Sequence, residues 1–263
     1  MKICSFNVNS IKARLEVIAE WLKRRENDID VLCLQELKGV DETFPHEFFN
    51  SHGFHYCETF GQKAYNGVAI CSKLPLTNVK RGFTTDCADA QRRIIQADIS
   101  GITIINVYVP HGDERGTEKY YYKLNWYKSL LDHIEAATSK NIVIVGDLNV
   151  TREDIDVYDP KAYHDTVATM PEERESLQRI IDCGLTDAFR HLYPDVRQYT
   201  WWAYGAAIWK DQGLRIDYVL TTKEMIKRLR SIEVDVWPRK KKTLKPSDHA
   251  PLIVEFDVVT ISF

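Results

Sequence analysis

Short apolar runs that predict buried strands recur along the chain, and several of them end in polar residues. The clearest run is residues 142–145, four apolar β-branched residues that predict a strand buried on both faces. It ends at Gly146, and Asp147 and Asn149 follow at once. If the extended geometry continues past Gly146, these two side chains leave the same face of the strand end. Taken alone, such a tripeptide is more often an Asx turn that ends a strand.

Other strands follow the same pattern. Residues 3–8 predict a strand that ends in Asn7 and Asn9, and residues 31–34 predict one that ends at Glu36. The further predicted strands are 67–71, 93–99, 102–108, 198–202, 214–220, 232–236 and 252–256. A tight turn at Ser100 and Gly101 joins two of them into a hairpin.

Helical periodicity separates these strands. It predicts helices over residues 11–22 after an N-cap at Ser10, over 120–134, over 171–181 with a stop at Gly184, and over 223–230. Two strand-rich halves, each with covering helices, indicate an α/β protein in which two sheets pack face to face with helices outside.

Length and composition restrict the possible organisation. The chain has 263 residues and is 44% hydrophobic, which is enough for a sizeable core. Because no linker-like stretch divides it, we expect one domain over residues 1–263, with pseudo-repeated halves at about 1–136 and 137–263. The net charge of -3 gives no global attraction to nucleic acid, so any such binding requires local basic patches.

The cysteines and the hydropathy pattern bear on location. Six cysteines are scattered without a C-x-x-C pair, and several lie in apolar runs, so we expect buried thiols in a reducing compartment. No apolar run reaches the length of a membrane span. The sequence therefore predicts a cytoplasmic protein with no membrane partner.

The polar strand ends supply the candidate chemistry. They share oxygen-rich or imidazole side chains, and they are Asn7, Asn9, Glu36, Tyr108, Asp147, Asn149, Asp217, Asp248 and His249. Gathered at one edge, they would favour Mg²⁺ or Mn²⁺ over Zn²⁺ and would point to phosphate chemistry. Each residue alone has an ordinary interpretation, His249 as a loop histidine and Glu36 as a surface acid. The recurrence of the pattern favours a site.

Several motifs occur together in a familiar order. They are Phe6-Asn7-Val8-Asn9-Ser10, Leu34-Gln35-Glu36, Asn106-Val107-Tyr108, Gly146-Asp147-Leu148-Asn149, Gly213-Leu214-Arg215-Ile216-Asp217 and Ser247-Asp248-His249-Ala250-Pro251. Together they resemble the exonuclease III family of apurinic/apyrimidinic endonucleases from residue 1 to about 257. Residues 89–95 and 171–175 resemble its bacterial branch most closely.

The resemblance implies a four-layer α/β sandwich, with two packed mixed sheets flanked by helices. It also implies a hydrolase of base excision repair that uses Mg²⁺, with Mn²⁺ as a substitute, to cut duplex DNA 5′ to abasic sites. Family members commonly add 3′-to-5′ exonuclease, 3′-phosphatase and 3′-phosphodiesterase activities. The expected partner is double-stranded DNA with abasic sites or blocked 3′ ends, and the expected state is a monomer.

The resemblance also assigns roles to residues of this sequence. Glu36 would be the principal metal ligand, and the wider ligand set would be Asn7, Asn9, Glu36, Asp147, Asn149, Asp248 and His249. The catalytic set would be Tyr108, Asp147, Asn149, Asp217 and His249. In it, Asp147 is the base or water-positioning carboxylate, Asn149 holds the water or a phosphate oxygen, and Asp217 orients His249. Tyr108 would reach the phosphate as a hydrogen-bond donor or as a phenolate.

DNA contacts are expected from apolar and basic residues. Trp201 and Leu214 match the pocket that receives the flipped abasic sugar. Trp209 could press into the minor groove or pack on its own loop. Lys38 and Arg92 are candidates for phosphate contacts, as are Arg93 and the basic run 239–242, which could equally be a solvated turn.

Two departures from the family pattern affect the expected balance between incision at abasic sites and exonuclease or 3′-end repair. His111 stands where the family usually has Gln, and the loop over residues 156–171 offers Tyr163, His164, Asp165 and Thr166 where many members have asparagines. Two other classes of function stay open: a phosphatase or phosphodiesterase for inositol phosphates or sphingomyelin, and a non-enzymatic nucleic-acid-binding regulator. The first is opposed by the Leu-Arg-Ile-Asp run and the second by the retained candidate ligands.

Overall fold

Two six-stranded sheets form the centre of the protein. The computed structural model describes residues 1–87 and 90–258, so Asp89, part of one motif quoted above, lies outside the described residues. In spatial order, the first sheet contains β13 (Leu229–Val234), β14 (Leu252–Phe256), β1 (Lys2–Asn7), β2 (Val31–Gln35), β4 (Val68–Ser72) and β3 (Tyr56–Phe60). The second contains β5 (Thr77–Arg81), β6 (Ile94–Ile99), β7 (Ile102–Tyr108), β8 (Ile142–Asp147), β12 (Asp217–Thr222) and β9 (Leu185–Asp187). A separate short ribbon pairs β10 (Trp201–Trp202) with β11 (Gly213–Leu214).

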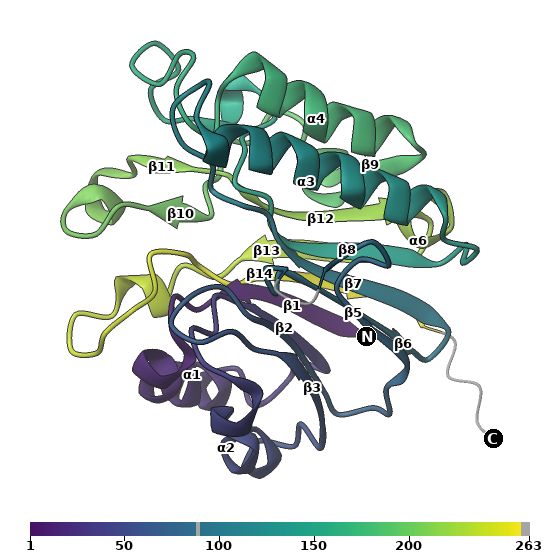
Figure 1. Ribbon diagram of the computed structural model, residues 1–263. Coiled ribbons are helices and arrows are strands. Elements are labelled where there is room, and N and C mark those ends of the chain that lie inside the picture. Colours follow the sequence, from purple (N-terminus) through teal and green to yellow (C-terminus); the bar gives the residue numbers. More distant parts are fainter. Residues whose placement is uncertain (88–89, 259–263) are drawn as a thin grey trace.

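Helices cover the outer faces of both sheets (Figure 1). On the first sheet they are α1 (Ile11–Arg24) and α2 (His46–Ser51), and on the second they are α3 (Glu118–Glu135) and α4 (Pro171–Asp182). The short helices α5 (Ala188–Leu192) and α6 (Lys223–Ile226) instead contribute Ala188, Phe189 and Met225 to the core between the sheets. One apolar core lies between the sheets, a second joins α1 and α2 to the first sheet, and a third joins α3 and α4 to the second. The predicted four-layer α/β sandwich is therefore confirmed. Among the described helices, none combines the length and apolar character needed to cross a membrane.

Strand register places the polar strand ends at one edge of the sandwich. Both sheets are mixed: β1 and β2 are parallel with Asn7 opposite Gln35, and β7 and β8 are parallel with Tyr108 opposite Asp147. β12 runs antiparallel to β8 and begins with Asp217 opposite Asp147. The ends of β1, β2, β7 and β8 and the start of β12 therefore supply side chains to the same region.

A buried amide links the two sheets close to this edge. The side chain of Asn106 on β7 donates from Nδ2 to the carbonyl oxygens of Leu34 and Ala69 at 2.9 and 2.8 Å, and these belong to the opposite sheet. Its Oδ1 accepts a hydrogen bond from Gln35 Nε2 at 2.7 Å. The packing distance between the sheets is thus set by directional hydrogen bonds as well as by apolar contacts.

Several predicted boundaries were wrong. The strand predicted over 214–220 is interrupted, because the N–H of Arg215 bonds the Asp156 carbonyl and those of Ile216 and Asp217 bond Thr200 Oγ1. Strand 198–202 shrinks to β10, and the helix predicted over 223–230 ends at Ile226 because β13 starts at Leu229. β3, β5, β9, α2 and α5 were not predicted; β5 is a mostly exposed edge strand without an apolar face to reveal it.

Two further expectations bear on the N-terminal half. Ser10 precedes α1 but adopts a φ of 87°, and its side chain caps nothing among the described residues. All six cysteines lie within the described residues and are free thiols, but Cys87 and Cys183 are exposed, so the prediction of buried thiols fails for them. Each sheet draws strands from both halves of the chain, and the division into one domain with two pseudo-repeated halves stays a prediction.

Candidate active site at the shared sheet edge

Three side chains from different strand ends converge at the edge described above. Glu36 follows β2, Asp147 ends β8, and His249 precedes β14. Each offers one ligand atom, and these atoms all lie within 4.8 Å of one another. Glu36 is only partly buried, whereas Asp147 and His249 are buried, so the group is open to solvent on the Glu36 side.

The chain leaves β8 through a tight turn that brings Asn149 back onto Asp147. Gly146 has a φ of 143°, and a Cβ atom there would lie 1.9 Å from the Val107 carbonyl oxygen, so only glycine fits. Asn149 is left-handed with a φ of 52°, and its N–H donates to Asp147 Oδ1 at 2.9 Å. The side chains are therefore brought together by an Asx turn, and not by the continued extended geometry considered above.

Asp217 and Asp147 flank the buried His249 ring. Nδ1 of His249 lies 2.9 Å from Asp217 Oδ2, and Nε2 lies 3.6 Å from Asp147 Oδ2. Burial alone would lower the pKa of His249, but the two carboxylates outweigh it and raise the pKa to about 10. Burial also raises the pKa of Asp147 to about 7. His249 is therefore protonated near neutral pH, and Asp147 gains or loses its proton in the same pH range.

Tyr108 enters the site from the neighbouring strand. Burial, followed by the charges of Glu36 and Asp147, raises the pKa of its phenol well above the ordinary value. The guanidinium of Arg93 stacks over the ring at 4.6 Å and donates to the Tyr108 carbonyl oxygen at 3.2 Å. Of the two roles considered for Tyr108, hydrogen-bond donor and phenolate, these surroundings favour the donor.

Two predicted ligands present nitrogen, not oxygen, to their carboxylate neighbours. Asn7 Nδ2 donates to Glu36 Oε1 at 2.8 Å and to Asp147 Oδ2 at 2.9 Å, so the amide must turn over to offer its oxygen to a cation. Asn9 Nδ2 donates to Asp248 Oδ1 at 2.9 Å. Asn9 and Asp248 form a pair beside the convergent group, and their direct ligation stays a prediction.

Two of the predicted phosphate-binding cations lie on loops, Lys38 after β2 and Arg92 before β6. Lys38 Nζ is 2.5 Å from Asn9 Oδ1 and 3.1 Å from Glu36 Oε2, so it lies directly beside the carboxylates. Arg92 donates to the Gly61 carbonyl oxygen at 2.5 Å and stays about two-fifths exposed. Arg92 also lies 3.6 Å from Asp41 Oδ2, and the contact of both cations with DNA stays a prediction.

The residues predicted to form a sugar pocket do pack together. Trp201 and Leu214 are a cross-strand pair of the β10–β11 ribbon and belong to one apolar cluster with Ile216. Trp201 Nε1 donates to Asp248 Oδ2 at 3.0 Å, which ties this cluster to the Asn9–Asp248 pair beside the convergent group. Ile216 was not singled out from the sequence, although its place between Arg215 and Asp217 in the motif was a usable signal.

The loop between β10 and β11 carries two exposed aromatic residues. Trp209 is 54% exposed, and Lys242 Nζ lies 4.8 Å from its ring. Tyr204 is also exposed, and its hydroxyl lies 3.2 Å from Asn9 Nδ2 at the margin of the site. Arg239 is buried and donates to carbonyl oxygens of this loop, so part of the basic run 239–242 is structural. Sequence reasoning missed Tyr204 because a lone tyrosine in a loop carries no periodic signal.

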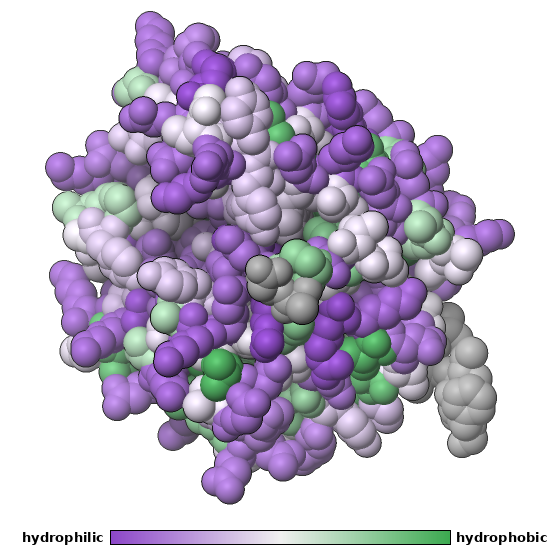
Figure 2. Space-filling model, in the orientation of Figure 1, coloured by the Kyte–Doolittle hydropathy of each residue, from purple (hydrophilic) through white to green (hydrophobic). Residues whose placement is uncertain are grey.

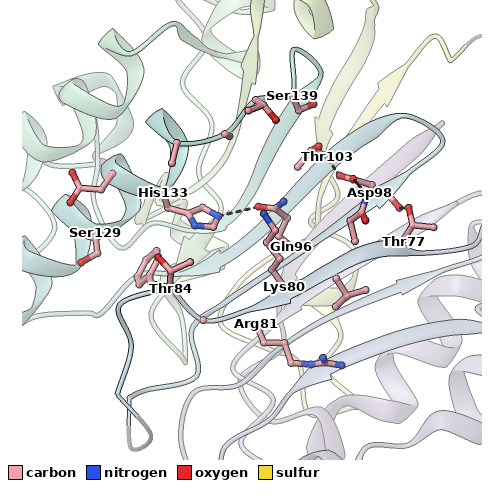
Figure 3. Close-up of a pocket in the computed structure, with 18 of the residues that line it drawn as sticks. Thr77, Lys80, Arg81, Thr84, Gln96, Asp98, Thr103, Ser129, His133 and Ser139 are labelled. Atoms are coloured by element: carbon pink, nitrogen blue, oxygen red, sulfur yellow. Dashed lines mark hydrogen bonds between the residues drawn. The ribbon is translucent and has the colours of Figure 1, made fainter.

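A cavity of about 1060 Å³ elsewhere contains none of the candidate residues. It lies on the outer side of β5 and β6 beside the C-terminal part of α3, where His133 bonds Gln96 at 3.0 Å (Figure 3). The face shown in Figure 2 is mostly hydrophilic, with hydrophobic residues in small separate groups. Cavity size therefore does not locate the chemistry, whereas the convergence of titratable groups does.

The donor set fits a hard divalent cation. Glu36 and Asp147 supply carboxylate oxygens, and His249 supplies an imidazole nitrogen once it has lost its proton. The raised pKa of Asp147 reflects a buried negative charge that lacks sufficient compensation, which a cation would provide. A group of potential metal ligands is therefore present, and the choice of Mg²⁺ belongs to the proposal below.

Comparison with known proteins places this geometry in a family. The model described as the endonuclease/exonuclease/phosphatase family matches residues 4–249. The chain belongs to this family. It is 37% identical to exodeoxyribonuclease III of Haemophilus influenzae, over 97% of this chain and 100% of that protein.

Solved structures of family members superpose closely. A 3′ phosphatase from Neisseria, NExo, bound to a product DNA hairpin, has a TM-score of 0.92 and 38% identity, with coverage of 98% of this chain and 99% of that chain. An AP endonuclease from Archaeoglobus fulgidus has a TM-score of 0.92 and 37% identity, with coverage of 98% and 100%. The predicted membership of the exonuclease III family, and with it the prediction of a hydrolase with nuclease chemistry, is confirmed. The individual site residues stay predictions.

Proposed function

We propose that the protein is a Mg²⁺-dependent DNA-repair nuclease that cuts duplex DNA 5′ to abasic sites and also trims 3′ ends. Trimming would include 3′-to-5′ exonuclease, 3′-phosphatase and 3′-phosphodiesterase reactions, and Mn²⁺ would substitute for Mg²⁺. The observation that carries the proposal is the convergence of Glu36, Asp147 and His249 within 4.8 Å at the shared sheet edge. Relatives named as exodeoxyribonuclease III, AP endonuclease and 3′ phosphatase support the substrate class.

The residues divide the hydrolytic step between them. Asp147, with a pKa of about 7, accepts a proton from the attacking water, whose oxygen bonds to phosphorus while the bond to the leaving 3′ oxygen breaks; that oxygen takes up a proton from solvent and leaves as a hydroxyl. The protonated His249 and the Tyr108 hydroxyl donate hydrogen bonds to phosphate oxygens as negative charge develops there. Asn149 orients the water or the phosphate beside Asp147.

The cation would be held by Glu36, with Asp147 and Asn7 as further donors and Asn9, Asn149 and Asp248 as outer candidates. His249 would join this set only in its deprotonated form, which would replace its hydrogen bond to the phosphate. When bound, Mg²⁺ would supply positive charge that offsets the anionic phosphodiester. Trp201 and Leu214 would receive the flipped sugar, while Lys38, Arg92 and Trp209 would contact the flanking DNA. We also propose that the protein acts as a monomer, because one chain supplies every group in this scheme. The expected cytoplasmic location stays a prediction.

The test is a duplex oligonucleotide with one central abasic site, labelled at each end in separate reactions, with Mg²⁺ or with EDTA. A metal-dependent nick on the 5′ side of the lesion is expected, and an undamaged duplex of the same sequence is the control. Shortening from the 3′ ends measures the exonuclease share, and a 3′-phosphorylated primer measures the phosphatase share. An intact abasic duplex with both Mg²⁺ and Mn²⁺ would overturn the proposal.

A further inference from the structure

A fully buried ammonium lies behind the candidate site and is not used in the scheme above. Lys123 on α3 has no exposed surface, and its Nζ donates to Asn149 O at 2.7 Å, His111 O at 3.1 Å and Glu173 Oε1 at 2.6 Å. The three protons of the ammonium therefore have three acceptors. Glu173 on α4 is also buried and accepts a second hydrogen bond from the Met170 N–H at 3.3 Å.

Two of these acceptors are backbone carbonyls just beyond the ends of β7 and β8. His111 follows Tyr108 by three residues, and Asn149 follows Asp147 by two. Lys123 therefore joins the two loops that leave the parallel strand pair, directly beside the residues assigned to chemistry. Gly112 allows this approach, because a Cβ atom there would lie 2.9 Å from Lys123 Cδ and its φ is 79°.

Asn149 is held at three of its four polar groups. Its N–H bonds Asp147 Oδ1, its side-chain Nδ2 donates to Val109 O at 2.8 Å, and its carbonyl accepts from Lys123. Among residues 1–87 and 90–258 the amide Oδ1 accepts no hydrogen bond, so it is the group that can face a water molecule or a phosphate. Asn149 also adopts a left-handed backbone conformation, which asparagine tolerates better than most residues, and the three hydrogen bonds fix the residue in it.

We propose that Lys123 is a positioning residue: its buried ammonium holds the Asn149 backbone in the left-handed turn and so aims Asn149 Oδ1, and through the Asx turn Asp147, at the reacting phosphate. This inference rests on the proposed function for its kinetic consequence. Glu173 compensates the ammonium charge, and the Lys123–Glu173 pair couples α3 and α4 to the site. The effect is geometric, so it falls on the chemical step more than on DNA binding.

The test replaces the whole pair with Lys123→Met/Glu173→Gln, which leaves no unpaired buried charge and keeps an acceptor for the Met170 N–H. The matched control is Arg25→Met/Asp235→Asn, which removes a largely buried ion pair of 3.1 Å from the opposite helical layer. Arg25 also pairs with Asp28 and Glu233, and among the described residues neither control side chain forms a hydrogen bond or an ion pair with a candidate site residue. Both variants and the wild type are assayed on the abasic duplex with Mg²⁺, and their Tm values are measured.

We expect the Lys123 variant to lose about 10- to 100-fold in kcat with KM changed less than about threefold. The control variant should keep a kcat within about twofold of the wild-type value, even if its Tm falls as much as that of the Lys123 variant. A crystal structure of the Lys123 variant should show Asn149 displaced from the left-handed turn. Unchanged kcat, or equal losses in the two variants, would overturn the inference. If the wild type leaves the abasic duplex intact, the proposed function fails, and the position of Asn149 in that crystal structure alone decides the inference.

Discussion

Burial disfavours the charged form of the Asp147 carboxylate, although the proposed reaction requires that form as a base. Asp147 is 1% exposed, accepts hydrogen bonds from Asn7 and Asn149, and has its pKa raised to about 7 by burial. A carboxylate in that condition is a poor contributor to stability but a suitable base at neutral pH. The same side chain therefore links the stability of the protein to its proposed activity.

Asp147→Asn should lower kcat by about 10²- to 10⁴-fold, the range typical for removal of a general base. An amide cannot accept the proton from the attacking water, although it can still accept the hydrogen bond from the Asn149 N–H. The measurement is single-turnover cleavage of the abasic duplex, with circular dichroism to verify the fold. Wild-type rates in this variant would remove Asp147 from the mechanism.

The pH dependence of stability follows from the same shift. Because the pKa of Asp147 is higher in the folded state (about 7) than its ordinary value of 3.8, the folded protein binds more protons between these values. Stability without divalent cation should therefore fall as pH rises from about 4 to about 7. Because the pKa of His249 is also raised, from 6.5 to about 10, the stability of the folded protein should continue to fall as pH rises between these values. Thermal melts in EDTA from pH 5 to pH 9 should show a shallower slope for Asp147→Asn, and parallel curves would contradict the assignment.

At the level of elements, the ends of β1, β2, β7 and β8 position the candidate site residues. The distance between the strand ends of one sheet and those of the other depends on the link between the sheets. Asn106 provides that link through hydrogen bonds to Leu34 O and Ala69 O. The motif that contains Asn106 was visible in the sequence as a family feature. Its role as a bridge between sheets was not, because a buried amide in a strand gives no sign of its partners.

Asn106→Leu should destabilise the protein by about 1–3 kcal/mol, because two buried carbonyls and the Gln35 amide lose a partner. Urea denaturation measures the change in the free energy of unfolding. The control is Ser231→Ala on the exposed face of β13, for which we expect a change within about 0.5 kcal/mol. Equal stability of Asn106→Leu and wild type would show that apolar packing alone sets the sheet spacing.

Elements with strong periodicity were predicted well, and those defined by long-range contacts were not. The runs around Ile144, Leu34 and Val107 gave β8, β2 and β7 because both faces of these strands are buried. The interruption at Arg215 depends on the hydrogen bond from its N–H to the carbonyl oxygen of Asp156, 59 residues away in sequence, which no local pattern reveals. The polar residues at the ends of β1, β2, β7 and β8 were found because each follows an apolar run, whereas Asp217 and His249 lie at or before the start of a strand. Lys123, inside a helix of ordinary amphipathic pattern, was not found.

For the whole molecule, the convergent carboxylates predict that a divalent cation stabilises the folded state. Mg²⁺ bound only by the native protein would add about 2.7 kcal/mol at a concentration one hundred times its Kd. Thermal melts with increasing Mg²⁺ should therefore rise in the wild type and much less in Glu36→Gln. An identical rise in both proteins would show that Glu36 is not a ligand.

Charge at the scale of the molecule leads to a prediction about DNA binding. The net charge is -3, so attraction to DNA must come from the local cations around the site, such as Lys38 and Arg92. Raising the salt concentration should weaken binding to the abasic duplex, with a linear dependence of log K on log salt. Lys38→Ala should reduce the magnitude of the slope of log K against log salt by about one, because one fewer phosphate contact is made. An unchanged slope would show that Lys38 does not contact the DNA.

The pairing of β1 with β14 has a consequence for biosynthesis. Asn7 lies at the end of the earliest strand and His249 just before the latest described one, and the Ser247 hydroxyl bonds the Asn7 carbonyl at 2.7 Å. A ribosome must therefore release β14 before the proposed catalytic groups can meet. Nascent chains, which are made close to messenger RNA, would be unable to hydrolyse phosphodiesters until synthesis of this segment is complete.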